Sequence, residues 1–441
     1  MSGGEQPFGG RRLHFVGIGG AGMSGLALVT ARLGAQVTGS DRADSPYLAA
    51  LREAGLEPAV GHDAAHVPPD AEVVFSTAIA AENPERAVAR ERGQHELHRG
   101  GLLAELATLK RCLAVTGTHG KTTTAAMTVH ALRGCGMDPA YVVGAELPDV
   151  GANAGWGEGE WIVVEADESD RSLLSIRPEI AVLTNAELDH HATYGSRLDL
   201  EATLRDFLAP ARCAVIWDRP ELLALRDGPV VPYEVTAPRL DAGGARFQWE
   251  GVEVVLSVPG HHNVRNAAAA LSACRVAGAD VARAAEALAG FRGAARRFEP
   301  CGRTTTGALL YDDYAHHPTE VRATIEAART LGPRRVVAVF QPHLYSRTAA
   351  LHREFGAALA GADLPVVLEV YRARERPEDH PEISGRLVAE ATADAAAGRR
   401  VCWLPGFDEA ERFLRAELRD GDLCLTLGAG DVDTLARRLR A

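Results

Sequence analysis

Lysine is nearly absent from this chain of 441 residues. Of the 47 basic residues, only Lys110 and Lys121 are lysines, and the others are arginines. A lysine at a defined position of a motif is therefore informative, because the chain almost never uses one.

Other absences exclude whole classes of protein. The seven cysteines are an odd number and form no C-x-x-C pair, so a disulfide framework or zinc site is not expected. The first twelve residues lack an apolar signal segment, and no stretch approaches the ~20 apolar residues of a membrane span. We therefore expect a cytoplasmic protein without membrane contact. A net charge of -12 argues against nucleic acid as a partner.

The chain repeats short apolar runs, glycine-containing loops and amphipathic stretches. Strands are predicted at 12–19, 35–41 and 73–77, with a helix at 21–33, and this alternation predicts β-α-β units with parallel sheets. A second block resumes the pattern near Leu113, includes an antiparallel hairpin at 247–258, and a third block starts near Phe298. At roughly 150 residues per domain the length suggests about three domains. We predict an α/β protein with domains 1–108, 109–297 and 298–441.

The first motif is GIGGAGMSG. It contains G-x-G-x-x-G at Gly17, Gly19 and Gly22 between a strand and a helix, and Asp41 ends the next strand. Glycines at this place let a diphosphate approach the N–H groups of a helix N-terminus. The pattern fits NAD or FAD, but it also fits a UDP-sugar, and a tight turn without ligand is the third alternative.

The second motif is TGTHGKTTT. The first glycine of the common P-loop is replaced by Val115, but G-x-x-G-K-T remains from Gly117 to Thr122. In such a loop Gly120 lets backbone N–H groups cradle phosphates, Lys121 reaches the β- and γ-phosphates, and Thr122 holds Mg²⁺. Because Lys121 is one of only two lysines, we predict an ATP site here.

Polar clusters follow several later strands. Glu165 begins EADESD, which by itself fits either a Mg²⁺ site or a solvated acidic loop. The nearby P-loop favours the Mg²⁺ site for Glu165. TNAELDHH offers Asn185, Asp189 and His190. Three His-His pairs occur, and we expect at most one functional histidine in each. Arg347 in QPHLYSR can clamp a carboxylate with both arms of its guanidinium.

Taken together, the motifs resemble those of the Mur ligase family over about residues 11 to 437. GTHGKTTT, EADESD, TN-x-E-x-DH, G-x-HN-x-x-NA, F-x-G-x-x-RRF and DDYAHHPTE occur in the family's order. The resemblance implies Rossmann-like N- and C-terminal domains that flank a central P-loop ATPase-type domain. The first would bind the UDP part of a substrate, the second ATP, and the third an amino acid.

Residue roles follow from the resemblance motif by motif. The catalytic residues would be Lys121, His190, His316 and Arg347, and the metal ligands Thr122, Glu165 and His190. The ATP site would comprise Gly117, Thr118, His119, Gly120, Lys121, Thr122, Thr123, His262, Asn263, Asn266, Arg297 and Asp313. The UDP part would contact Gly17, Gly19, Gly20, Gly22, Asp41 and Ser76. The amino acid would contact Tyr314, His316, His343 and Arg347.

GIGGAGMSGLA and DDYAHHP resemble most the subgroup that joins L-alanine to UDP-N-acetylmuramate with ATP and Mg²⁺, as a monomer or homodimer. A murein-tripeptide recycling ligase is the alternative, and a nicotinamide-dependent oxidoreductase is a weaker one that leaves Lys121 without a role. The chain departs from the pattern at Leu344, where the subgroup often has arginine, and at Ala192, where a carboxylate is expected. Sister ligases use a carbamylated lysine, but the predicted helix at 198–208 contains no lysine, so we expect no carbamate.

Overall fold

The computed structural model describes residues 6–190, 193–241 and 243–441. The chain divides into two compact units. One comprises the described residues up to Ala186, Leu198–Tyr233 and Ala269–Ala287, and the other comprises Glu187–Arg197, Glu234–Ala268 and Leu288–Ala441. The domain boundaries expected at residues 109 and 298 stay predictions. No helix in the described part of the chain has the length and apolar character needed to cross a membrane.

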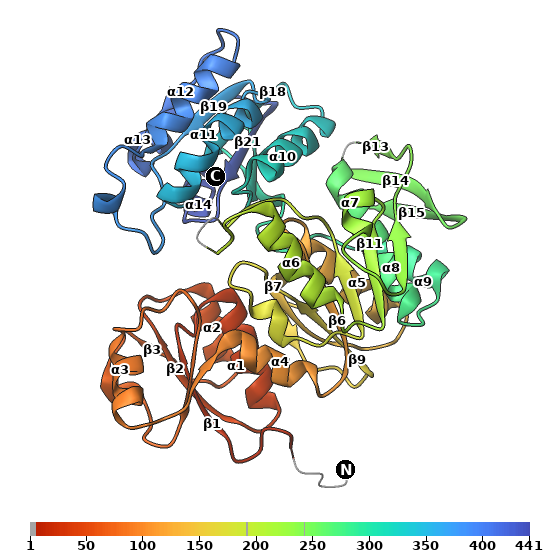
Figure 1. Ribbon diagram of the computed structural model, residues 1–441. Helices are drawn as coiled ribbons and strands as arrows, with labels where there is room; N and C mark the ends of the chain where they lie inside the picture. Colours follow the sequence, from red (N-terminus) through yellow and green to blue (C-terminus); the bar gives the residue numbers. More distant parts are fainter. Residues whose placement is uncertain (1–5, 191–192, 242) are drawn as a thin grey trace. The chain divides into compact units, whose positions relative to one another are not determined.

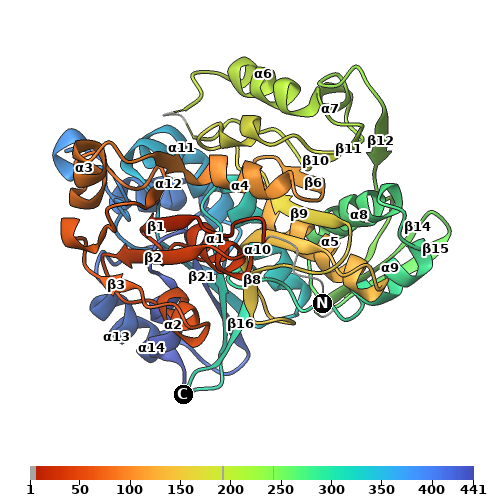
Figure 2. The ribbon, with the colours of Figure 1, turned by 90° about the horizontal axis from the view of Figure 1, so that it is seen from below.

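The first unit begins with a sheet of five parallel strands in the order β3-β2-β1-β4-β5. Figure 2 shows β1, β2 and β3 side by side. The strands are β1 Arg12–Val16, β2 Gln36–Asp41, β3 Ala59–Val60, β4 Glu72–Phe75 and β5 Glu96–His98. The helices are α1 Ala21–Arg32, α2 Pro46–Glu53, the short η1 Ala64–His66, α3 Pro84–Glu91 and α4 Arg99–Ala107.

The second sheet of this unit has seven strands in the order β12-β11-β10-β6-β9-β7-β8. Only β8 is antiparallel to its neighbour, so β6, β9 and β10 end at the same carboxyl edge. The strands are β6 Arg111–Thr116, β7 Ala140–Leu147, β8 Ala152–Gly155, β9 Trp161–Glu165, β10 Ile180–Leu183, β11 Cys213–Trp217 and β12 Val230–Tyr233. The helices are α5 Lys121–Gly134, η2 Ser172–Ser175, α6 Arg197–Leu208, α7 Pro220–Leu223 and α9 Val281–Leu288, which ends one residue beyond this unit.

The second unit contains a small antiparallel sheet and a larger mixed one. The predicted hairpin at 247–258 is confirmed, with a turn at Glu250 and Gly251 between two antiparallel strands. The small sheet comprises β13 Arg239–Asp241, β14 Gly244–Trp249 and β15 Val252–Leu256. Helix α8 His261–Val276 follows it, and its residues from Ala269 onward belong to the first unit. The larger sheet has the order β16-β17-β21-β18-β19-β20, in which only β16 is antiparallel.

Strand β18 shows why this larger sheet is covered on both faces. Its apolar residues alternate between two cores, with Val336, Ala338 and Phe340 in one and Val337 and Val339 in the other. Helices α10, α11 and α12 supply the first core, and α13 and α14 supply the second (Figure 1). The strands are β16 Glu299–Arg303, β17 Leu309–Asp313, β18 Arg335–Phe340, β19 Leu364–Val367, β20 Cys402–Trp403 and β21 Asp422–Leu427. The helices are α10 Pro318–Thr330, α11 Tyr345–Leu359, η3 Pro377–Asp379, α12 Gly385–Ala395, α13 Phe407–Glu417 and α14 Asp433–Leu439.

Candidate active site

The loop between β6 and α5 has the backbone of a phosphate-binding turn. Gly117 and Gly120 have φ values of +123° and +79°, which side chains disfavour. Gly120 directly precedes α5 and provides no side-chain cap. The first N–H groups of α5 therefore point into the loop, where an anion can accept hydrogen bonds from them. All seven residues of the predicted ATP loop, 117–123, lie here or in the first turn of α5.

Two residues at the end of β10 hold this loop in shape. Thr184 Oγ1 donates to His119 O at 2.6 Å. The Asn185 amide contacts both backbone groups of His119, accepting from its N–H and donating to its carbonyl at 2.9 Å each. A methyl group on Gly117 would lie 2.3 Å from Thr184 Oγ1. The sequence pointed to Asn185 as a site residue, but Thr184 was missed.

Lys121 has three partners within and beside this loop. Its Nζ donates to Gly117 O at 2.7 Å and to Thr118 O at 3.2 Å, and it pairs with Glu168 Oε2 at 2.8 Å. Burial opposes the charge of Lys121, but Glu168 and neighbouring carboxylates raise its pKa above the usual range. Burial raises the pKa of Glu168 to about 7, although Lys121 counteracts this. The ammonium can reach a phosphate only by exchanging these partners.

Two of the three predicted metal ligands are adjacent. Thr122 Oγ1 donates to Glu165 Oε1 at 3.0 Å, and Gly144 N donates to the other carboxylate oxygen at 2.8 Å. A methyl group on Gly144 would lie 2.6 Å from Glu165 Oε2, so only glycine leaves the carboxylate in place. A hydroxyl and a carboxylate are oxygen ligands of the kind that Mg²⁺ prefers. The third predicted ligand, His190, belongs to the other unit.

Arg99, at the start of α4, reaches the acidic loop that follows β9. Its Nη2 donates to Asp167 Oδ2 at 2.7 Å and lies 3.4 Å from Asp170 Oδ2. Burial works against the charge of Asp167, but Arg99 and Lys121 lower its pKa well below the usual range. Arg99 could not be found from the sequence, because its partners are 68 and 71 residues away in the chain and it belongs to no motif.

The glycine loop predicted for the UDP part lies at the carboxyl edge of the first sheet. Gly17 has φ +79°, and Gly19 N donates to Asp41 Oδ2 at 2.9 Å. Gly20 precedes α1 without a side-chain cap, Gly22 lies in its first turn, and Ser76 directly follows β4. The six predicted residues are therefore at the ends of β1, β2 and β4, and the Asp41 carboxylate binds the loop itself.

A buried network supports this loop from below. Ser40 O accepts from Gly17 N at 2.8 Å and from Ile18 N at 2.9 Å. Ser40 Oγ in turn donates to Glu85, whose side chain is fully buried, at 2.6 Å. His14 Nε2 lies 3.4 Å from the same carboxylate oxygen. None of these supporting residues was singled out by the sequence, because Ser40 and Glu85 are remote from the glycine motif in the chain and His14 lies in the apolar strand before it.

If the loop binds a UDP-sugar as predicted, we expect Gly19→Ala to weaken that binding by about tenfold or more, since overpacking a tight site costs ~1–3 kcal/mol. A methyl group there would lie 2.3 Å from Leu48 Cδ1 and 3.0 Å from Asp41 Oδ2. Gly20→Ala is the matched comparison, because its methyl group would meet nothing closer than 3.5 Å. The measurement is the Kd of a UDP-sugar by titration calorimetry. Equal losses in both variants would contradict a steric cause.

In the second unit, Arg347 is bound to a carboxylate of the protein. Its Nε and Nη2 donate to the two oxygens of Asp189 at 2.9 and 3.0 Å, and both side chains are about 4% exposed or less. Its Nη1 lies 3.0 Å from His343 Nδ1. The sequence identified Arg347 as a carboxylate clamp for a substrate. In this structure Asp189 accepts from Nε and Nη2 of the guanidinium, and a role for Arg347 in holding a substrate carboxylate stays a prediction.

The other predicted amino-acid residues cluster around this pair. The ring of His316 is 5.3 Å from that of Tyr314 and 6.0 Å from that of His343, measured between centroids. Burial lowers the pKa of His316 to about 4 and also lowers the pKa of His343. His316 Nδ1 must donate to Tyr314 O, 3.0 Å away, since a carbonyl only accepts. Its Nε2 is therefore the acceptor in the neutral ring.

Asp313 and Arg297 lie beside this cluster. The Asp313 carboxylate accepts from Phe298 N at 2.8 Å and from Ala315 N at 2.7 Å. Burial raises its pKa to about 7. The Arg297 guanidinium lies 5.1 Å from the centroid of the Tyr314 ring.

The remaining predicted ATP residues are in the first turns of α8. Asn263 Nδ2 donates to Pro259 O at 2.7 Å, and Asn266 Nδ2 donates to Asn263 Oδ1 at 3.3 Å. Burial lowers the pKa of His262 to about 4, so this ring is neutral near pH 7. His261 is exposed and His262 is half-buried, and the expectation of at most one functional histidine in each pair stays a prediction.

The other His-His pairs differ in a similar way. His317 is the N-cap of α10 and completes a capping box with Glu320, whereas His316 faces the rings described above. His190 has φ +53° and donates its N–H to Asp189 Oδ1 at 2.7 Å. His191 and Ala192, which carry the expected departure from the motif, lie outside the described residues.

Three non-glycine residues near these groups have left-handed backbone. Arg296, Phe298 and Leu344 have φ values of +56°, +53° and +68°. Arg296 was missed by the sequence, yet its guanidinium donates to Asp312 Oδ2 and to the carbonyls of Gly428 and Gly430 at 2.8–3.0 Å. Leu344 is buried directly before α11 and replaces the arginine that the resemblance leads one to expect.

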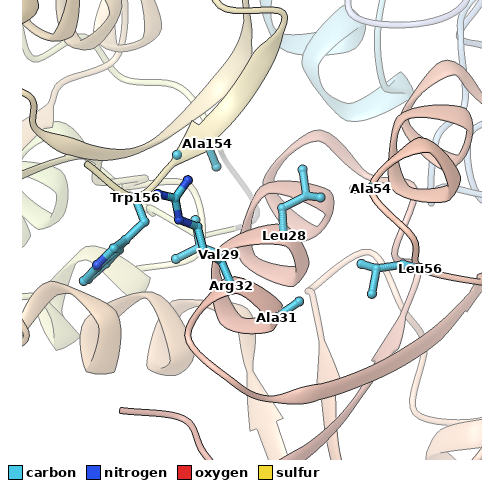
Figure 3. A pocket seen from close by; sticks show the side chains of 9 residues that line it. Leu28, Val29, Ala31, Arg32, Ala54, Leu56, Ala154 and Trp156 are labelled. Atoms are coloured by element: carbon cyan, nitrogen blue, oxygen red, sulfur yellow. The ribbon is translucent and has the colours of Figure 1, made fainter. Parts of the chain in front are cut away.

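A pocket of about 420 Å³ in the first unit contains none of the predicted site residues. Figure 3 shows Arg32 extending toward Ala154 and Trp156, with Leu28 and Leu56 on the opposite side. The residues of α1 that line it are near the C-terminal end of the helix, whereas the glycine loop is at its N-terminal end. This pocket is therefore separate from the predicted substrate loop.

Family models match three consecutive stretches of the chain. They are the Mur ligase family catalytic domain over residues 12–111, the Mur ligase middle domain over 115–274, and the Mur ligase glutamate ligase domain over 296–430. The chain belongs to the Mur ligase family, and its α/β architecture of parallel-rich sheets is that of the family.

Curated relatives and solved structures are similar over nearly the whole length. The UDP-N-acetylmuramate–L-alanine ligases of Mycolicibacterium smegmatis and Kineococcus radiotolerans are 44% and 46% identical, with 96% of this chain and 93–94% of each relative covered. The crystal structure of the UDP-N-acetylmuramate-alanine ligase of Thermotoga maritima is 30% identical with a TM-score of 0.84, covering 97% of this chain and 98% of that one. A murein peptide ligase from Psychrobacter arcticus, at 23% identity and a TM-score of 0.74 with 98% of both chains covered, shares the fold.

Proposed function

We propose that this chain is an ATP-dependent ligase that joins L-alanine to the lactyl carboxylate of UDP-N-acetylmuramate in peptidoglycan precursor synthesis. The observation that carries the proposal is the identity above 40% with alanine ligases along almost the entire chain. The two glycine loops supply the matching chemistry, one for a diphosphate and one for ATP. An oxidoreductase would leave the P-loop and Lys121 unused.

The reaction proceeds in two displacements. An oxygen of the lactyl carboxylate attacks the γ-phosphorus of ATP, and the bond from this phosphorus to the β–γ bridging oxygen breaks. ADP departs, and an acyl phosphate is formed. The neutral amine of alanine then attacks the acyl carbon, the carbon–oxygen bond to phosphate breaks, and inorganic phosphate leaves with an amide formed. Much of the acceleration comes from holding the reactants together, since a positioned pair reacts far faster than free partners.

In the first unit, residues 117–123 would bind the phosphates of ATP. The N–H groups at the start of α5 would donate to them, and Lys121 would turn from Glu168 toward the β- and γ-phosphates. Thr184 and Asn185 keep the loop open for this exchange. Gly17, Gly19, Gly20, Gly22, Asp41 and Ser76 would bind the UDP part.

The oxygen ligands beside the P-loop suit a magnesium ion. Thr122 and Glu165 are 3.0 Å apart at the carboxyl edge of the sheet, and we propose that they hold Mg²⁺ together with His190. A bound Mg²⁺ would offset the negative charges of the phosphates and the carboxylate. Thr122 and Glu165 keep their oxygens oriented through each other and through Gly144 N.

In the second unit, His262, Asn263, Asn266, Arg297 and Asp313 would complete the ATP site. Tyr314, His316 and His343 would surround the alanine, and Arg347 would orient His343 and Asp189 instead of holding the substrate carboxylate alone. The alanine ammonium must lose a proton before it attacks. His316 Nε2 and His190 are our candidates to accept it. We further propose that the enzyme works in the cytoplasm, as a monomer or homodimer.

The test is phosphate release by purified protein with Mg-ATP, UDP-N-acetylmuramate and a panel of alanine, glycine, serine and murein tripeptide. We expect release only when both the UDP sugar and an amino acid are present, with alanine favoured. Small side chains are separated by ~1–3 kcal/mol each, so glycine and serine should react more slowly. Preference for the tripeptide would support the recycling ligase instead. No release with any acceptor would overturn the proposed ligase.

A further inference from the structure

The predicted diphosphate loop has an unmet electrostatic requirement. The six residues expected to bind the UDP part include one acid, Asp41, and no cation. A diphosphate carries at least two negative charges, and backbone N–H groups offset them only in part. A cation next to the loop would satisfy this requirement, and the structure places one there.

Arg99 approaches the glycine loop from the neighbouring helix. Helices α1 and α4 lie side by side in the first unit (Figure 1). A methyl group placed on Gly22 would lie 3.5 Å from Arg99 Nη1. Gly22 is in the first turn of α1, where an anion would meet the helix N-terminus. The Nη1 end of the guanidinium is therefore at the place where phosphate oxygens are expected.

The two ends of this guanidinium differ in their partners. Nη2 is committed to Asp167 and Asp170, which fix the position of the side chain. Nη1 and Nε form no hydrogen bond with any residue in the described part of the chain. Arg99 is half-buried, with its side chain 22% exposed, so Nη1 is held in place without losing access to a ligand. A guanidinium can contact two anions at once because its donors form a rigid fork.

We propose that Arg99 is a further substrate-binding residue, whose Nη1 donates to the diphosphate of the UDP substrate while Nη2 stays on Asp167. The assignment rests on the proposed function, since that function supplies the diphosphate. It has a structural consequence, because Asp167 is adjacent to Glu168, which holds Lys121. One side chain therefore joins the UDP loop to the loop that faces the nucleotide.

The test is calorimetric binding of UDP-N-acetylmuramate and of UDP-N-acetylglucosamine to ATP-free protein. The second ligand has the same diphosphate but no lactyl carboxylate. We expect Arg99→Gln to weaken both by about tenfold or more, the effect of losing one charge-assisted hydrogen bond. Turnover should show a raised KM for the UDP substrate with the KM for ATP little changed. A loss confined to UDP-N-acetylmuramate would place Arg99 at the carboxylate and overturn the assignment.

Two further variants separate binding from folding. Arg99→Lys keeps a positive charge beside Asp167 but cannot span two anions, so it should fold normally and still bind both UDP sugars more weakly. Arg11→Gln is the matched control, because Arg11 is also half-buried and pairs with Glu72 and Glu105, away from the glycine loop. It should bind as the wild type does. Wild-type affinity in Arg99→Lys and Arg99→Gln would overturn this inference alone. Absence of binding by the wild type would overturn the proposed function and this inference with it.

Discussion

Lys121→Ala should lower kcat by about a thousandfold or more while the protein stays folded. The ammonium is the one P-loop cation that can reach the transferred phosphoryl group, and a charge lost at that point affects the transition state most. Glu168 would then lose its counter-charge, and its pKa, already raised to about 7 by burial, would rise further. The carboxyl group would bind a proton, which avoids a buried unpaired charge.

The scarcity of lysine provides a control for this variant. Lys110 contacts Gly159 O and lies 5.2 Å from the centroid of the Trp156 ring, outside both glycine loops. Lys110→Ala should leave kcat unchanged. Phosphate release at saturating substrates is the measurement, with thermal unfolding as the check on folding. A Lys121→Ala enzyme within about tenfold of the wild-type kcat would contradict the assigned role.

Arg347→Met should lower the unfolding midpoint by about 10 °C, because it leaves the buried Asp189 carboxylate without its partner. Breaking a buried ion pair from one side costs ~3–5 kcal/mol, and each kcal/mol shifts the midpoint by ~2–4 °C in a unit of this size. Arg347 and Asp189 are both almost fully buried and joined by two hydrogen bonds. The loss should be accompanied by weak alanine binding, since Arg347 also orients His343.

The double variant Arg347→Met with Asp189→Asn separates the cost of the unpaired Asp189 charge from the cost of lost packing. Removing both charges should recover most of the lost stability without recovering activity. Arg347 lowers the pKa of Asp189 despite burial, so the ion pair contributes above about pH 4 and is lost only in stronger acid. In Arg347→Met the buried Asp189 carboxyl loses the charge that lowers its pKa, so it should bind a proton more readily as the pH falls. The destabilisation by Arg347→Met should therefore be smaller at pH 6 than at pH 8, measured by calorimetry. No recovery in the double variant would show that packing, and not the unpaired charge, carries the effect.

The sequence predicted those parts of the fold that depend on local pattern. The glycine turns, the β-α-β alternation and the hairpin at 247–258 are each encoded within a few residues, and the family assignment built on them is confirmed. Strands β7 and β8 were missed. Gly144 interrupts the apolar pattern of β7, and glycine weakens a strand signal although here it makes room for Glu165.

The contacts that complete the site could not be read from local pattern. Arg99 meets Asp167, and Arg347 meets Asp189, across 68 and 158 residues of chain. Arginine residues are abundant here, so neither position is distinctive in the sequence. The residue type of Arg347 did indicate a carboxylate partner, but only the fold reveals that the carboxylate belongs to Asp189.

The left-handed backbone at His190, Arg296, Phe298 and Leu344 has a consequence for stabilising this protein by design. Each such residue costs roughly 1–3 kcal/mol that a glycine would not incur. Relieving backbone strain at these four positions in a search for thermostable variants would change residues beside Asp189 and Asp313. Those substitutions would remove side chains that position the candidate site. Heat resistance and turnover would then compete at the same few residues, and an engineer should seek stability in the pocket lined by Leu28 and Trp156 instead.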